Sequence, residues 1–389
     1  MSVDAHPAVR PVITGLGVLS ACGPGLGPLT AAAGHGRAGF STVTRFDVSQ
    51  RRTVRAALLA GPVRLGDAVL GVIGDACRQA GLPERTPRER AGREQADEPA
   101  EEHPTPLLLA LHSDLGTREV AATVAAGAAD SWGVPGVTRV YTGACVAAGT
   151  AVADAAALVS SGRHPRVLVA AGHLVEPGVF AAFDAGRALA RDGELRPFSA
   201  GRTGTLLGDA AVAVVVEAEA AAELRGAPVL ARLAGWGRSG DAYHVCRPTP
   251  DGEGMARAAE SALARAGVEP AEVGYVNANG TGSPLADRAE ANALRRVFGA
   301  HTARLPVSSS KSVHGHALEA SALLELAVTI GALQSGLLPV NAGWIGRDEE
   351  IELDLVLDGP REARPRPRYA LSLNSAFGGA NTALLVAAG

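Results

Sequence analysis

A cysteine at the start of a small-residue stretch is the first residue that could do covalent chemistry. Cys145 stands in "TGACVAAGTAV", where a tight turn precedes a run of Ala, Gly and Val that is typical of a helix. Free N–H groups and the positive dipole end of a helix N-terminus favour a thiolate over a thiol. The same N–H groups could hold the oxyanion formed when a thioester is attacked. Taken by itself, Cys145 could equally be a small, inert buried residue.

The second stretch that could carry chemistry is "PVSSSKSVHGHALEASALLE", residues 306–325. It contains Lys311, the one lysine of the chain, whereas the other 35 of the 36 Lys and Arg residues are arginine. An ammonium is a compact charge that fits inside a packed site, whereas a guanidinium is wide and planar. The retention of Lys311 therefore predicts a specific role. His316 follows a glycine at a turn before the next helix.

Two further glycine-rich turns follow predicted strands. "VNANGTGSPLADRAE", residues 276–290, contains Asn279, and "SLNSAFGGANTALLV", residues 372–386, contains Phe377. Neither turn is specific alone, because glycine-rich turns are common connections. Together with the cysteine and histidine stretches, their order along the chain becomes specific.

Composition excludes several classes of function. The net charge of −4 argues against a nucleic-acid partner, which needs basic excess. The four cysteines are too few and too scattered for a disulfide framework or a zinc site, and they indicate a reducing cytoplasm. "LSAC", residues 19–22, resembles a lipoprotein cleavage box, but the short glycine-broken stretch before it favours a buried first strand. No apolar run reaches the length of about 18 residues that a spanning helix needs.

Alternation of β-rich runs with helical windows predicts an α/β fold with a mixed or parallel sheet covered by helices. The charged, proline-containing segment 84–106 is predicted to be a solvated loop. The predicted strands lie near residues 11–13, 107–111, 138–141, 166–170, 211–217, 229–236, 273–276, 305–308, 369–372 and 382–386. The predicted helices span residues 67–80, 146–161, 255–266, 287–298 and 318–333.

A faint internal repeat connects the two chemical stretches. "TRVYTGACVAAGTAVADAAALVSSGRHPRVLVAAG" and "RLPVSSSKSVHGHALEASALLELAVTIGALQSGLLP" both begin as a strand, a tight turn and a small-residue helix. If the halves are structural copies, Cys145 and His316 occupy equivalent turns and meet near a pseudo-twofold axis. Such a meeting point would be a natural shared active site.

In this order, the stretches resemble the β-ketoacyl-acyl-carrier-protein synthase family, of the elongating type with a thiolase fold. "PVITGLGVLSACG" is similar to the family's first strand, and "TGACVAAGTAV" to its nucleophile elbow. "RPFSAGRTGTLLGDAAVAVVVE" resembles its Arg-Pro-Phe-Asp run, and "DAYHVCRPTPDGEGMARA" the start of its second half. "SSSKSVHGHALEASALLE" resembles its lysine–histidine motif, and "NSAFGGAN" its Phe-Gly-Gly turn. The resemblance covers nearly the whole chain.

The resemblance implies a thiolase-like α/β fold of two pseudo-repeated halves in a layered αβαβα arrangement. Residues 1–220 would form the first half, with the nucleophile, and residues 221–389 the second. It implies no metal or redox cofactor, and a substrate carried on the phosphopantetheine of an acyl carrier protein or on coenzyme A. It also implies a homodimer or a heterodimer with another ketosynthase-family subunit. The expected setting is polyketide, antibiotic or specialised lipid biosynthesis in a cytoplasm.

The resemblance also assigns roles residue by residue. Cys145 would be the acyl-accepting nucleophile, and the backbone N–H groups of Cys145 and Phe377 would form the oxyanion hole. Phe377 would also act as a gate beside the thiol. Lys311 would support the site around His316, with Glu325 at the position of a buried glutamate near that lysine. The matching loop residues Thr281 and Gly378 would support the site.

The clearest departure from the family pattern is Asn279, which stands where the family's His-Gly-Thr-Gly-Thr loop begins with histidine. That histidine is one of two that bind the extender's thioester oxygen. Asparagine can donate a hydrogen bond to an enolate oxygen, but it cannot carry a proton or a charge.

Three consequences remain open. Decarboxylative elongation could be impaired while acyl transfer to Cys145 survives. Asn279 and His316 could jointly hold an enolate, which would allow cyclisation or non-malonyl carbon–carbon bond formation. Alternatively, the protein could be a chain-length-factor-like subunit that shapes a partner's tunnel, although retention of Cys145, Lys311 and His316 argues against a purely structural role.

Other departures concern the surroundings of the nucleophile. The segment between the strand at 107–111 and Cys145 is shorter than in the family, which puts ordinary homodimerisation and the shape of the acyl pocket in question. Glu319 replaces a family glycine and is expected to be a solvated helix residue, with a carboxylate base in the cavity as the alternative. His314 is expected to be a surface turn residue.

Overall fold

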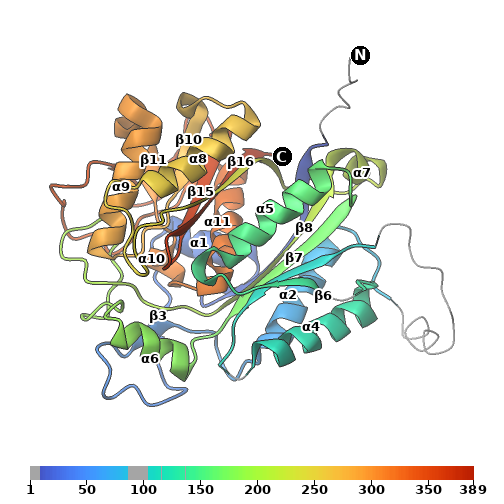
Figure 1. Ribbon diagram of the computed structural model, residues 1–389, viewed down its shortest axis with the longest axis horizontal. Coiled ribbons are helices and arrows are strands. Elements are labelled where there is room, and N and C mark those ends of the chain that lie inside the picture. The colour runs from blue at the N-terminus through green and yellow to red at the C-terminus, as the bar shows by residue number, and fades with distance from the viewer. Residues whose placement is uncertain (1–8, 86–103, 115, 136) are drawn as a thin grey trace.

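The computed structural model describes residues 9–85, 104–114, 116–135 and 137–389. Within these residues, the main strands form one large sheet that consists of two five-stranded halves (Figure 1). The first half has the order β1(Pro11–Ser20), β8(Ala210–Ala218), β7(Arg166–His173), β5(Leu107–Leu111) and β6(Val137–Tyr141). The second half has the order β9(Ala231–Gly240), β16(Ala380–Ala388), β15(Tyr369–Ser375), β10(Val273–Asn277) and β11(Pro306–Ser308).

The two halves repeat the same pairing pattern. In each half the first three strands pair antiparallel and the last three pair parallel. The first strands of the two halves, β1 and β9, pair antiparallel with each other and join the halves. The internal repeat predicted from the sequence is therefore confirmed by the topology.

Helices form three layers around the two half-sheets (Figure 1). α2(Leu65–Gln79) packs on β1, β7 and β8 together with α4(Thr117–Trp132), and α8(Glu253–Ala266) packs on β9 and β16 together with α9(Pro284–Phe298). Between the half-sheets lie α5(Ala147–Ser160) and α11(Ser321–Ser335), which contact each other and strands of both halves. The arrangement is the layered αβαβα fold that the resemblance implied.

Glycines allow the outer helices to approach equivalent strands in each half. A Cβ atom on Gly17 of β1 would collide with the backbone carbonyl of Val72 in α2. At the equivalent place, a Cβ atom on Gly237 of β9 would collide with the carbonyl of Ala258 in α8. These close contacts fix the helices on the sheet and repeat the pseudo-twofold relation.

The remaining elements connect this framework. The other helices are α1(Leu26–Gly34), α6(Pro177–Ala185), α7(Glu219–Leu224) and α10(Lys311–His314), with 3-10 turns η1(Ala144–Val146), η2(Pro270–Glu272), η3(Gly299–Arg304) and η4(Leu318–Ala320). The short strands are β2(Gly23–Pro24), β3(Phe40–Thr42), β4(Arg55–Ala57), β12(Leu337–Leu338), β13(Asp354–Leu355) and β14(Arg361–Glu362).

All ten predicted strands are present. The first of them, β1, is buried, as the sequence predicted. The predicted helices did not include α1, α4, α6, α7 or α10, and most of the loop predicted at 84–106 lies outside the described residues. Among the described helices, the stretch Leu318–Ser335 is long and apolar enough to cross a membrane, but 89% of it is buried within the protein, as in a core helix.

Candidate active site

Two equivalent turns bring a cysteine and a histidine together at the centre of the fold. Cys145 lies in η1, directly before α5, and His316 lies two residues before the start of η4, which leads into α11. Both turns contain a non-glycine residue with left-handed backbone geometry, Ala144 at φ 51° and Leu318 at φ 38°. Such strain persists only where the surrounding structure enforces it, and it is common at functional sites.

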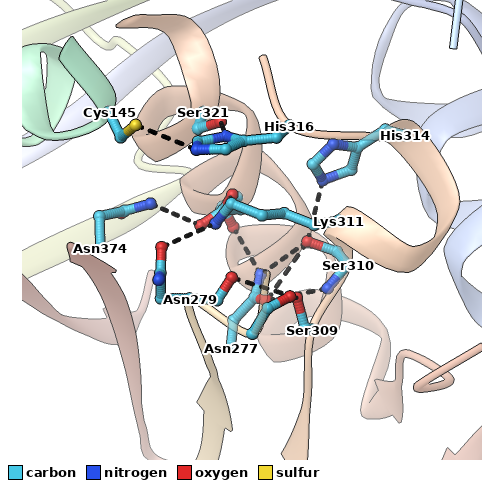
Figure 2. Close-up of polar contacts among 12 residues, drawn as sticks. Cys145, Asn277, Asn279, Ser309, Ser310, Lys311, His314, His316, Ser321 and Asn374 are labelled. Atoms are coloured by element: carbon cyan, nitrogen blue, oxygen red, sulfur yellow. Dashed lines mark hydrogen bonds and ion pairs between the residues drawn. The ribbon is translucent and has the colours of Figure 1, made fainter. Parts of the chain in front are cut away.

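The cysteine and histidine form a hydrogen-bonded dyad (Figure 2). Nε2 of His316 lies 3.0 Å from Sγ of Cys145. On its other side, Nδ1 of His316 lies 2.8 Å from Oγ of Ser321, the first residue of α11. All three residues are buried, and the imidazole has a contact at each ring nitrogen.

Burial keeps both members of the dyad uncharged. It raises the pKa of the Cys145 thiol to about 12, and the carboxylate of Glu319 raises that pKa further, whereas Lys311 lowers it. Burial also lowers the pKa of His316 well below its usual value, with Lys311 as the next cause. At neutral pH the site therefore holds a neutral thiol beside a neutral imidazole.

Lys311 lies beneath the dyad with no solvent exposure. Its Nζ atom forms an ion pair with Oε1 of Glu325 at 2.6 Å, and the other carboxylate oxygen accepts a hydrogen bond of 2.8 Å from Asn374 Nδ2. A buried ammonium requires such a partner because an isolated buried charge is very costly. The structure thus places Glu325 beside Lys311, as the resemblance implied.

Asn279 connects this ion pair to the cavity. Lys311 Nζ donates a hydrogen bond of 3.2 Å to Asn279 Oδ1 (Figure 2). Because an ammonium only donates, it must face the amide oxygen, which turns the NH₂ group of Asn279 away from Lys311. The loop is held by Glu290, whose two carboxylate oxygens accept the backbone N–H groups of Asn279 and Gly280 at 2.7 Å each.

A second polar network fixes the helix that carries the lysine. The Asn277 side chain at the end of β10 donates hydrogen bonds to Ser310 Oγ at 3.2 Å and to Thr329 Oγ1 at 3.3 Å. The Ser309 hydroxyl donates to the backbone carbonyl of Gly280 at 2.8 Å. These buried bonds join α10 to α11 and to the Asn279 loop, so Lys311 has little freedom to move.

The dyad opens into a cavity of about 210 Å³. Cys145, His316 and Asn279 line it together with Phe377, and so do Thr281 and the arginines Arg187 and Arg247. The cavity therefore joins Cys145 to solvent, and Arg187 and Arg247 make part of its lining cationic.

Phe377 occupies the turn after β15 and is 54% exposed. Its ring centroid lies 5.8 Å from that of Phe183, which also lines the cavity. The backbone N–H of Phe377 donates to no other described residue, whereas that of Gly378 donates to Val245 O at 2.8 Å. The turn thus presents one free N–H and one aromatic side chain near the thiol.

Two predictions about neighbouring residues are wrong. His314 is fully buried rather than on the surface, with Nδ1 2.8 Å from the carbonyl oxygen of Gly315 and Nε2 3.1 Å from Ser310 Oγ. Glu319 is also buried rather than solvated, because η4 packs against η1 and the strands β5, β7 and β8. Its Oε2 atom lies 3.7 Å from His173 Nδ1, and burial raises the pKa of its carboxyl group.

Three contacts of the site were not predicted: those of Ser321, Asn374 and Glu290. Asn374 lies three residues before Phe377, Glu290 lies in α9 and Ser321 lies five residues after His316, so all three belong to the glycine-rich or lysine–histidine stretches of the sequence. Their residue types did not mark them as contacts of the site; a serine at the start of a helix, for example, is common for local capping reasons.

Comparison with known proteins decides the family. The protein-family model described as "Beta-ketoacyl synthase, N-terminal domain" matches residues 75–222. A second family model, "Beta-ketoacyl synthase, C-terminal domain", matches residues 230–344. The chain belongs to the β-ketoacyl synthase family. The predicted family assignment is therefore confirmed.

Individual members of the family show how far the similarity extends. Nodulation protein E of Rhizobium meliloti is 38% identical over 272 residues, which are 69% of this chain and 66% of that protein. The 3-oxoacyl-[acyl-carrier-protein] synthase 2 of Coxiella burnetii is 41% identical over 192 residues, 49% of this chain and 46% of that protein. The matched regions thus span less than two thirds of these relatives' own lengths.

A solved structure extends the similarity to the whole fold. "The ishigamide ketosynthase/chain length factor" superposes with a TM-score of 0.86 at 27% identity, covering 98% of this chain and 100% of that chain. The described part of the chain therefore has the ketosynthase architecture.

Proposed function

We propose that this β-ketoacyl synthase family protein accepts an acyl group from a carrier-protein thioester on Cys145. The observation that carries the proposal is the Cys145–His316 dyad at 3.0 Å in a cavity that reaches solvent. The exchange between thioesters needs no net gain or loss of protons, because the departing carrier thiol takes up the proton that leaves Cys145.

The transfer can be written as a balanced exchange. The Cys145 sulfur attacks the carbonyl carbon of the incoming thioester, and the resulting oxyanion receives hydrogen bonds from the backbone N–H groups of Cys145 and Phe377. The carbon–sulfur bond to the carrier then breaks, and the proton from Cys145 goes to the departing carrier thiol. The product is an acyl-thioester on Cys145.

Asn279 affects the condensation step that would follow acyl transfer. The contact with Lys311 turns its amide NH₂ away from the lysine, and Asn279 lines the cavity beside His316. An amide N–H can stabilise an enolate oxygen, but it supplies neither charge nor proton, so decarboxylative elongation should be slower than with histidine. We therefore propose acyl transfer as the main activity, with condensation impaired or altered.

The proposed carrier is an acyl carrier protein, whose phosphopantetheine arm would enter past Arg187 and Arg247 at the cavity mouth. The Coxiella burnetii relative is named as a synthase that acts on acyl-carrier-protein substrates, 3-oxoacyl-[acyl-carrier-protein] synthase 2, which supports this choice. Arginine pairs well with phosphate through its planar, charged fork.

Intact-mass spectrometry after exposure to acyl-carrier thioesters tests the proposal. We expect a stable adduct on the wild type and none on Cys145→Ser. Asn279→His should then decarboxylate malonyl-carrier protein at least tenfold faster than the wild type. Equal decarboxylation by the two proteins would contradict the impaired elongation.

A chain-length-factor-like role is the second candidate, favoured by the similarity to the ishigamide ketosynthase/chain length factor. In that case the wild type would form no adduct and would co-purify with a second ketosynthase. The preserved dyad favours the acyltransferase.

A further inference from the structure

Ser321 is a residue of the site to which the proposed acyl transfer gives no role. It begins α11 and is fully buried, with its hydroxyl oxygen 2.8 Å from Nδ1 of His316. Figure 2 shows the imidazole between this hydroxyl and the Cys145 thiol. The imidazole therefore contacts Ser321 through one ring nitrogen and Cys145 through the other. The ring nitrogen that carries the hydrogen can donate, and the other can only accept.

Counting hydrogens determines the direction of the Ser321 bond. A neutral imidazole carries one hydrogen, on either Nδ1 or Nε2. If Nδ1 carried it, the Ser321 hydroxyl would accept that hydrogen, and its own hydrogen would have no acceptor among the described residues. Leaving a buried hydroxyl hydrogen without a partner is costly. If the Ser321 hydroxyl donates to Nδ1, its hydrogen has an acceptor and the imidazole hydrogen sits on Nε2.

The side toward Cys145 is compatible with this arrangement. A thiol is a weak donor and its sulfur is a weak acceptor. Little hydrogen-bond energy is therefore lost when the Cys145 sulfur accepts from Nε2–H, compared with the thiol donating to a bare Nε2. The same Nε2–H becomes a much stronger partner for a thiolate or for a thioester oxygen. The arrangement therefore favours the charged states of the reaction over the resting state.

We infer that Ser321 is a positioning residue that holds His316 in the Nε2–H form, so that His316 acts as a hydrogen-bond donor rather than as a base toward Cys145. His316 and the amide of Asn279 then supply two neutral donors to the same cavity. The thiol proton does not rest on His316 during transfer and passes to the departing carrier thiol. The inference about the hydrogen position stands on the structure alone, whereas its kinetic consequence rests on the proposed function.

The hydrogen position can be read by NMR without any reaction. Protein with ¹⁵N-labelled histidine gives long-range ¹H–¹⁵N correlations that distinguish the two forms, and His316→Asn identifies the His316 signals among the ten histidines. At pH 7.5 we expect the hydrogen of His316 on Nε2. In Ser321→Ala the share of the Nδ1–H form should rise about five- to tenfold, the effect of one lost hydrogen bond.

Acylation rates provide the second readout. Ser321→Ala should slow acylation of Cys145 by about tenfold, and Ser321→Thr, which keeps the hydroxyl, should restore it to within about twofold. Ser335→Ala is the matched control, because it removes a hydroxyl at the far end of the same helix, where Ser335 bonds to Gly331 O at 2.8 Å. This control should leave both readouts unchanged.

Two results would overturn the inference. One is a wild-type His316 that carries its hydrogen on Nδ1, and the other is a Ser321→Ala variant with unchanged hydrogen position. If the wild type forms no acyl adduct at all, the proposed function fails, and the NMR result still decides the role of Ser321.

Discussion

Lys311 Nζ lies 3.2 Å from Asn279 Oδ1, and this contact fixes the amide that lines the cavity together with Cys145. The lysine thus does two things at once: it neutralises Glu325 and it orients Asn279. The second task matters because an amide must be turned the right way to act as a donor. The contact therefore gives a physical reason for a lysine at this position.

Lys311→Arg is expected to abolish acylation of Cys145 or to prevent folding. The side chain has no exposure, and a planar guanidinium cannot occupy the volume of an ammonium between Glu325 and Asn279. Far-UV circular dichroism separates the two outcomes, and intact mass measures acylation. A folded variant that is acylated at the wild-type rate would show that the lysine is dispensable.

Lys311→Met should lower the free energy of unfolding by roughly 3–5 kcal/mol, because it leaves the Glu325 carboxylate buried without its cation. The double variant with Glu325→Gln should recover much of this loss, since the amide carries no charge and its oxygen can still accept the bond from Asn374. Urea unfolding midpoints measure both effects. No recovery in the double variant would mean that the ion pair is not the source of the loss.

Alkylation of Cys145 should increase about tenfold for each pH unit between 7 and 9, without a plateau, because its pKa is raised to about 12 and only the thiolate reacts. The measurement is iodoacetamide labelling followed by peptide mass spectrometry, in a Cys246→Ser background that removes an exposed thiol. Glu319→Gln removes a nearby negative charge, so it should lower the thiol pKa and speed labelling at pH 8 by roughly two- to tenfold. A plateau below pH 9 would show that the thiol is more acidic than its surroundings imply.

His314 should make the protein sensitive to mild acid. Burial, with Lys311 as the next cause, lowers its pKa to about 3 in the folded state, whereas the unfolded value is near 6.5. Below pH 6.5 the unfolded chain binds a proton that the folded protein does not, so stability falls as pH falls. Between pH 7.5 and 5.5 this one group should cost about 1.4 kcal/mol. Urea unfolding of His314→Gln at both values should show a smaller pH effect by that amount, and an identical pH effect would contradict the prediction.

Phe377→Ala should shorten the lifetime of the acyl-enzyme several-fold, because the exposed ring beside Phe183 covers the route by which water reaches the thioester. The decay of the adduct can be followed by intact mass. Leu285→Ala is the control, since Leu285 is also exposed, apolar and part of the cavity lining. Equal lifetimes in the wild type and Phe377→Ala would argue against a gate.

The fold was largely predictable because its signals are local. Strand β5 coincides with its predicted range, and the equivalence of the Cys145 and His316 turns followed from two similar stretches of sequence. α4 was missed because its run of alanine has no strong apolar period, so packing on α2 rather than pattern defines it.

The site was less predictable where burial depends on distant segments. His314 and Glu319 are polar residues in a glycine-containing turn, which normally indicates solvent. Both are buried, because α10 with His314 packs on α1, and η4 with Glu319 packs on η1 and on strands of the first half. Ser321 illustrates the same limit, because its contact with His316 depends on how the 3-10 turn η4 rotates the start of α11. Such contacts arise from three-dimensional packing, so the sequence immediately around a residue does not predict them.

Because Lys311 is the one lysine of the chain and is fully buried, its chemical reactivity reports unfolding around it. Apart from a backbone amino terminus, the chain offers no amine to acylating or cross-linking reagents until Lys311 becomes accessible. A lysine-specific protease likewise has one cleavage point, which the native interior shields. Labelling or cutting at Lys311 therefore reports the opening of the protein around Cys145 and His316, without any added tag.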